Sequence, residues 1–155
     1  GDAFVDINLS GLTRLPAYGI DVPCGGVSIT IGGSCANTAR QLASIGAPSS
    51  IAATFFSCVG GDSMGEHFRR SVAEEGLLAD CETSLHTLPG VAQSCCTILA
   101  GPSDRAMVSC YSSNHLVSVA PFRGALLDGA CPWSLLHLGG YFGCIGFHDE
   151  ACLEG

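Results

Sequence analysis

The sequence is poor in charged residues and poorer still in basic ones. Of its 155 residues, 13% are charged, and only 6 are Lys or Arg against 14 Asp or Glu, which gives a formal net charge of −8. A groove that binds nucleic acid needs clustered basic side chains to neutralise phosphates. The composition therefore argues against a nucleic-acid partner. Small anionic ligands remain compatible with it, because backbone N–H groups can bind phosphate.

Long apolar runs and closely paired cysteines are also lacking. No apolar run reaches the ~20 residues that a membrane-spanning helix needs, so we expect no membrane partner. The 10 cysteines include no C-x-x-C pair, the spacing typical of structural zinc sites, so we expect no metal site. We interpret the cysteines as small buried side chains in a reducing, cytoplasmic compartment. The chain starts without a methionine and stops inside an expected helix. We therefore expect a piece of a longer protein, and organelle targeting stays open.

Strand-like apolar runs alternate with helical patterns in the first half of the chain. Ser34 is placed to cap a first helix, and Ser63 with Glu66 forms a capping-box pattern at a second. Gly46 and Gly76 are placed to end these helices. Strand, glycine turn, helix, strand, helix is the rhythm of βαβ units, which predicts an α/β fold with a parallel sheet and flanking helices. The expected strands are 3–9, 27–31 and 50–59, and the expected helices are 34–45 and 63–75.

The second half differs, because β-prone segments follow one another without a helix between them. Segments 81–88, 91–100 and 105–111 are separated by proline or glycine turns. With the segment at approximately 24–31, we interpret the region 81–111 as the antiparallel strands of a small β-sheet lid. A short helical stretch near 126–127 and a buried strand at 134–138 complete the expected elements.

Polar and glycine residues gather where the expected strands end. Asp6 lies at the end of the first strand, Gly32 and Gly33 precede a helix, and Asn37 falls in the first turn of that helix. Ligands of open α/β sheets bind outside the carboxyl ends of the strands, so these residues should converge. A carboxylate, an amide and backbone N–H groups suit a polyhydroxylated ligand. A purely structural interpretation, in which Asp6 caps a turn and Asn37 caps a helix, fits the residue types equally well.

Taken together and in order, several segments resemble the PfkB (ribokinase-like) family of carbohydrate and nucleoside kinases. The resemblance covers nearly the whole chain, and the phenylalanines of Thr54-Phe55-Phe56 are similar to adenosine kinases. The segments are Gly1-Asp2-Ala3-Phe4-Val5-Asp6, Gly32 to Asn37, Ala52 to Glu66, Pro89-Gly90-Val91, Ser112-Ser113-Asn114 and His137-Leu138-Gly139-Gly140-Tyr141-Phe142.

The resemblance implies ATP-dependent phosphorylation of a sugar or nucleoside hydroxyl by a ribokinase-like α/β domain with a lid. Family members also use the lid for dimer contacts, so a homodimer through the lid is expected. Carried over by position, Asp6, Gly32, Gly33 and Asn37 would hold substrate hydroxyls. Asn114 and Tyr141 would belong to the lid hinge and the pocket wall.

One departure limits what this chain does alone. The family's second signature, Asp-Thr-x-Gly-Ala-Gly-Asp, is absent, and no G-x-x-x-x-G-K-[ST] motif replaces it. That signature supplies the catalytic aspartate and the anion hole, so we expect the catalytic residue beyond residue 155, with ATP and Mg²⁺ bound by the complete protein. Two alternatives stay open: a non-catalytic sugar-binding or dimerising remnant, and a Rossmann-like domain of an oxidoreductase. The second is disfavoured because no G-x-G-x-x-G follows the first strand.

Overall fold

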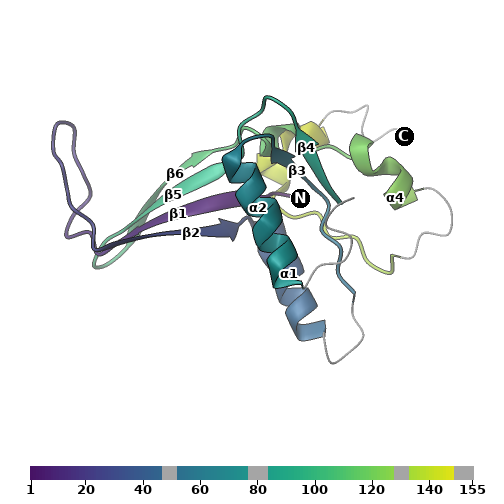
Figure 1. The fold of residues 1–155 in the computed structure, drawn as a ribbon, viewed down its shortest axis with the longest axis horizontal. Helices are drawn as coiled ribbons and strands as arrows, with labels where there is room; N and C mark the ends of the chain where they lie inside the picture. The colour runs from purple at the N-terminus through teal and green to yellow at the C-terminus, as the bar shows by residue number, and fades with distance from the viewer. Residues whose placement is uncertain (47–51, 77–83, 128–132, 149–155) are drawn as a thin grey trace.

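The computed structural model describes residues 1–46, 52–76, 84–127 and 133–148. Two sheets and two long helices form the body of the structure (Figure 1). In chain order the strands and α-helices are β1 (Phe4–Ser10), β2 (Gly26–Gly32), α1 (Ser34–Gly46), β3 (Ser57–Gly60), α2 (Ser63–Glu75), β4 (Leu85–Leu88), β5 (Cys95–Ala100), β6 (Arg105–Cys110) and α4 (Arg123–Leu127). Short 3-10 turns occur at η1 (Asn114–Leu116), η2 (Ala120–Phe122), η3 (Tyr141–Gly143) and η4 (Ile145–His148).

The larger sheet has the strand order β2-β1-β5-β6 and is mixed rather than parallel. β1 pairs antiparallel with β2 and parallel with β5, and β5 pairs antiparallel with β6. The antiparallel pairs involve the segments that the sequence predicted to be antiparallel, 24–31, 91–100 and 105–111, and β1 pairs in parallel with β5. The chain returns from β1 to β2 and from β5 to β6 without a crossover helix, and such direct returns produce antiparallel pairs. In Figure 1 the four strands run side by side away from the helices.

The core lies where α1 and α2 meet the start of β1. Small residues line the buried side of α1, and α2 contributes Phe68 and Val72, which are 0% and 1% exposed. Burying side chains of this size contributes about 1.5–3 kcal/mol each. These residues pack with Val5 and Val59 in one cluster, so the helices fix the position of the first strand.

The smaller sheet contains only β3 and β4, which pair in parallel from Ser57↔Leu85 to Gly60↔Leu88. The strand expected at 50–59 is shorter than predicted, because β3 begins only at Ser57 and residues 52–56 are not part of a strand. The segment expected at 81–88 was assigned to the antiparallel lid, and this assignment is wrong for its described part, 85–88. Residues 50–51 and 81–83 lie outside the described residues.

Helix boundaries agree with the sequence better than helix caps do. α2 ends where Gly76 adopts a left-handed conformation, with φ of 59°. Its N-cap is Asp62, whose side chain accepts a hydrogen bond from Gly65 N, so the expected capping box of Ser63 and Glu66 is not formed. Both residues lie inside the helix, one position further along than a capping box requires.

The strand expected at 134–138 is also absent. Leu135, Leu136 and Leu138 are 80%, 62% and 53% exposed and form no regular structure. A strand needs a neighbour to satisfy its backbone groups, and no described strand lies alongside this segment. Among the described residues there is likewise no helix with the length and apolar character needed to cross a membrane.

Candidate functional site

Asp6 and Gly32 lie against each other at the inner end of the larger sheet. Asp6 is the third residue of β1 and Gly32 the last of β2, diagonally across the antiparallel pair. A Cβ placed on Gly32 would lie 2.1 Å from Oδ2 of Asp6, so only glycine leaves room for this carboxylate. Asp6 is half-buried and accepts no hydrogen bond from any described residue. The sequence prediction that these two residues converge is confirmed.

Burial affects the charge state of Asp6. Desolvation raises the pKa of this carboxyl above its ordinary value, because a half-buried position disfavours the ionised form. A carboxylate held without partners at such a position is available to accept hydroxyl hydrogens from a ligand.

The N-terminus of α1 is capped by Asp2, a residue 32 positions away from Ser34 in the sequence. The Asp2 carboxylate is 7% exposed and accepts hydrogen bonds from Ser34 N at 2.9 Å, Ser34 Oγ at 2.9 Å and Cys35 N at 2.7 Å. Ser34 was expected to cap the helix, and this is wrong: its own N–H is bonded by Asp2. The first N–H groups of α1 are therefore occupied and do not form an open anion site.

Glycines permit the close approach of the segments around Asp2. Gly33 has φ of +106°, and a Cβ there would lie 2.6 Å from the Asp2 carbonyl oxygen. A Cβ on Gly140 would lie 2.3 Å from the Asp2 carboxyl carbon, and one on Gly139 would lie 2.7 Å from the Cys35 Cβ. Gly33, Gly139 and Gly140 thus lie at the start of β1 and α1.

Asn37 occupies the first turn of α1, where its N–H donates to the Gly33 carbonyl at 2.9 Å. Its side chain is exposed, and its Oδ1 accepts a hydrogen bond from Arg40 at 3.1 Å. Arg40 is in turn held by Glu75 of α2, with its Nε donating to the carboxylate at 2.7 Å. Asn37 therefore keeps its amide nitrogen on the exposed side of the helix start, and an ion pair between α1 and α2 orients its oxygen.

Asn114 is placed differently from the other predicted residues. It is 0% exposed, its Oδ1 accepts from Ala3 N at 2.9 Å, and its own N–H donates to Ser94 Oγ at 2.9 Å. These bonds tie η1 to the starts of β1 and β5. Its Nδ2 is buried without a hydrogen-bond partner among the described residues. Asn114 therefore connects η1 to the residues that precede β1 and β5.

Tyr141 begins η3 directly after Gly140 and is 38% exposed. Its ring stacks on Phe147 at a centroid distance of 6.4 Å and approaches His148 at 4.5 Å. Phe142, which the sequence reasoning did not single out, is 89% exposed beside it. The segment after Gly140 therefore presents two aromatic rings, one packed and one open.

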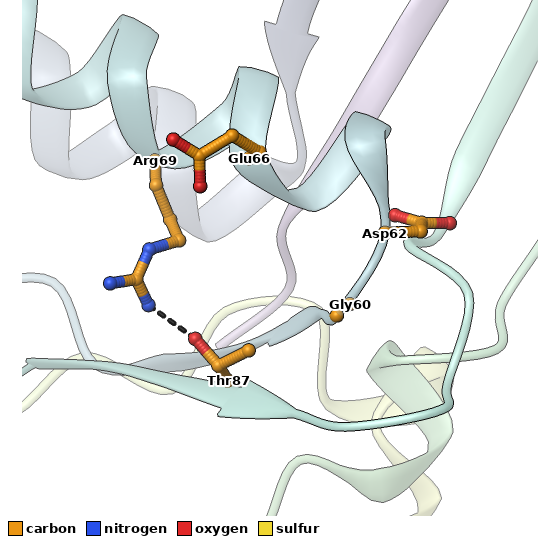
Figure 2. A pocket seen from close by; sticks show the side chains of 6 residues that line it. Gly60, Asp62, Glu66, Arg69 and Thr87 are labelled. Atoms are coloured by element: carbon orange, nitrogen blue, oxygen red, sulfur yellow. Dashed lines mark hydrogen bonds between the residues drawn. The ribbon is translucent and has the colours of Figure 1, made fainter.

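A pocket lies where β3 leads into α2, and Figure 2 shows its side chains. Arg69 from α2 points to Thr87 of β4 and donates to its hydroxyl and to the Leu85 carbonyl. Asp62 accepts from Gly65 N and, at 3.1 Å, from Gln93 N. Of the three charged side chains that line the pocket, the protein itself engages Asp62 and Arg69, and Glu66 is exposed. We interpret the pocket as structural. Arg69 is half-buried.

The described cysteines form neither a disulfide nor a metal site. They are free thiols, and no group of three or more possible metal ligands occurs among the described residues. Burial raises the pKa of Cys144 to about 11. The pKa of Cys110 is lowered by hydrogen bonds to Ser112, with the two side-chain atoms 3.0 Å apart.

Two residues that position the site were missed from the sequence. Asp2, which precedes β1, caps α1. Gln93 joins β3 to the residue before β1 by accepting from Gly60 N and donating to Ala3 O, both at 2.8 Å. Neither residue lies near its partners in the sequence, so no local pattern marks it. Gly60, Gly61 and Asp62 lie within the segment Ala52 to Glu66 that resembles the family, but their link to Gln93 depends on the tertiary fold.

Comparison with protein families decides the relationship. The model described as pfkB family carbohydrate kinase matches residues 2–108, which is more than half of the chain. The chain belongs to the PfkB carbohydrate kinase family. The matched range includes Asp6, Gly32, Gly33 and Asn37.

Several solved kinase structures are similar to this chain over part of their length. Ribokinase from Giardia lamblia has 18% identity and a TM-score of 0.66, with 80% of this chain and 35% of that chain covered. Ribokinase from Arabidopsis thaliana, complexed with ribose and ATP, has 19% identity and a TM-score of 0.60, with 74% and 35% covered. The Methanocaldococcus jannaschii nucleoside kinase has 16% identity and a TM-score of 0.60, with 75% and 37% covered.

This PfkB chain thus spans little more than a third of the length of these structures. At these identities the likeness shows the ribokinase-like fold, an α/β fold with a mixed sheet and flanking helices. Comparison with curated proteins gives no match.

Proposed function

We propose that the protein containing this chain transfers the γ-phosphoryl group of ATP to a hydroxyl of a sugar or nucleoside. Residues 1–155 supply its substrate-binding half. The observation that carries the proposal is the half-buried carboxylate of Asp6, which lies against Gly32 and has no hydrogen-bond partner among the described residues. The family match over residues 2–108 supports the reaction class.

The chemistry assigned to this half is binding and orientation. Asp6 accepts hydrogens from substrate hydroxyls, and the exposed amide of Asn37 adds a donor on the neighbouring helix. Gly32 and Gly33 leave room for the Asp6 carboxylate and the Asp2 carbonyl, so the first strand and the start of α1 can approach closely. Because Asp2 occupies the first N–H groups of α1, a neutral hydroxyl-bearing group fits here better than an anion.

ATP and Mg²⁺ are assigned to residues outside this chain. No described group of residues in it forms a metal site. In phosphoryl transfer the metal neutralises charge that develops on the phosphates, while the protein positions the attacking hydroxyl. In this proposal Asp6 and Asn37 hold the substrate still while its hydroxyl reacts, and Tyr141 forms part of the pocket wall.

The larger sheet, which contains most of the expected lid strands, supports a second proposal, a homodimer. On the face of the larger sheet opposite to Asp6, Val27, Ile29 and Val108 are 63%, 46% and 67% exposed. Exposed apolar patches of this kind mark interaction sites. Ile29→Asp should shift the complete protein from dimer to monomer in sedimentation velocity, and an unchanged sedimentation coefficient would contradict the dimer.

Steady-state kinetics of the complete protein tests the main proposal. Asp6→Asn and Asn37→Ala should each lower kcat/KM by about 100-fold or more, because a positioned charged hydrogen bond and an orienting amide are lost. Thermal melting should show that both variants remain folded. Wild-type kinetics in both variants would refute the site.

A further inference from the structure

We infer that Asn8 and Thr30 form a second hydroxyl-binding position next to Asp6, which selects substrates by the hydroxyls that project over the lid sheet. This inference rests on the proposed function, because it extends the same substrate site. Asn8 and Thr30 lie just outside the segments Gly1–Asp6 and Gly32–Asn37 that resemble the family's motifs.

The register of β1 and β2 places these side chains on one face. Asp6 is paired with Thr30 and Asn8 with Ser28, and residues two apart on a strand share a face. Asn8 Nδ2 donates to Thr30 Oγ1 at 3.2 Å, which confirms that the two side chains meet on that face. Figure 1 shows β1 and β2 side by side along their length.

Asn8, two residues after Asp6 on β1, contacts β2 in the same way as Asp6 does. Asp6 leans diagonally over Gly32 of β2, and Asn8 leans over Thr30 in the same relation. Successive residues on one face of a strand are about 7 Å apart, which is close to the width of a sugar ring. A ligand whose hydroxyl is held by Asp6 therefore reaches Asn8 and Thr30 with its far side.

Hydrogen-bond capacity is left over at this position. Thr30 Oγ1 accepts from Asn8, so its own hydroxyl hydrogen is free to donate, and Asn8 keeps its Oδ1 as an acceptor. No described residue takes up either group. Asp6, Thr30 and Asn8 thus present an acceptor, a donor and an acceptor in sequence, which matches a pair of neighbouring hydroxyls.

The opposite face of the same sheet provides a matched control. Thr97 of β5 is paired with Ile7, so its side chain is on the face away from Asp6. Thr30→Val and Thr97→Val make the same isosteric change on the two faces. Both valines suit a strand, so neither variant should unfold, and thermal melting checks this.

Kinetics of the complete protein with its best substrate, and with deoxy analogues lacking one hydroxyl each, tests the inference. Thr30→Val and Asn8→Ala should raise KM by about three- to tenfold with kcat changed less than about twofold, as expected for losing a neutral hydrogen bond in binding. With the deoxy analogue that lacks the hydroxyl bound at this position, Thr30→Val and Asn8→Ala should have the same KM as wild type. Thr97→Val should behave as wild type.

The outcomes separate this inference from the proposed function. If Asp6→Asn abolishes turnover but Thr30→Val and Asn8→Ala match Thr97→Val on every substrate, the second position is refuted and the kinase proposal stands. If Asp6→Asn keeps full turnover, the proposed site itself fails. If no substrate is phosphorylated, calorimetric titration with the same compounds replaces the kinetics, and equal dissociation constants for Thr30→Val and Thr97→Val refute the inference.

Discussion

Asp2 and Asp6 lie four residues apart in the sequence, and the structure assigns them opposite roles. Asp2 is buried and bonded to the start of α1, whereas Asp6 has no described partner. Replacing Asp2 by Ala removes three hydrogen bonds from a carboxylate that is 7% exposed. It leaves the buried N–H of Cys35 without an acceptor.

The magnitude follows from these contacts. Loss of an N-cap costs about 1 kcal/mol, and leaving a buried N–H unsatisfied costs about 1–3 kcal/mol. Asp2→Ala should therefore lower the free energy of unfolding by about 2–4 kcal/mol. Asp2→Asn should cost less, because its amide oxygen still accepts while its amide nitrogen faces an N–H donor.

Urea denaturation of the complete protein, followed by circular dichroism, measures this difference. Asp6→Asn is the matched control, since it makes the same chemical change on the same chain segment without breaking a described hydrogen bond. If Asp2→Ala is as stable as wild type within about 0.5 kcal/mol, the capping role is wrong. Equal losses in Asp2→Asn and Asp6→Asn would also contradict the assignment.

Three further predictions concern Asp6, Gly32 and two cysteines. The raised pKa of Asp6 means that its stabilising contribution is complete below the pKa of an unfolded aspartate and is lost as pH rises through the raised pKa. At neutral pH, Asp6→Asn should therefore be at least as stable as wild type in urea denaturation, and this advantage should vanish in acid; a clear loss of stability at neutral pH would contradict it. Gly32→Ala should raise KM by more than about tenfold, because its Cβ would lie 2.1 Å from the Asp6 carboxylate. The control is Gly26→Ala, whose Cβ meets only Ser10 Oγ at 3.2 Å. Equal KM values for the two variants would refute the close contact. Iodoacetamide near neutral pH should label exposed Cys110 well before buried Cys144, whose pKa is raised to about 11, and mass spectrometry showing the reverse order would overturn this.

The helices and the first strands could be predicted because their signals are local. Alanines at helical spacing and Gly46 predict α1 within a residue of its observed end, and Gly76 ends α2 as expected. The convergence of Asp6 with the Gly32-Gly33 turn followed from a general property of α/β sheets rather than from the residues alone.

Strand pairing and long-range caps could not be predicted in the same way. The segment 85–88 has the composition of a lid strand, yet it pairs with β3, because register depends on which neighbours are available. The leucines of 134–138 have strand propensity without a described partner. Asp2 caps α1 across 32 residues, and no sequence pattern connects a carboxylate to N–H groups at that separation.

The most direct test of the central claim is calorimetric titration of the complete protein, without ATP, against a panel of sugars and nucleosides. We predict saturable binding of at least one compound by wild type and by the Thr97→Val control, and loss of that binding in Asp6→Asn. If wild type binds none of the compounds, or if Asp6→Asn binds as tightly as wild type, the account of this chain as the substrate-binding half of a kinase is contradicted.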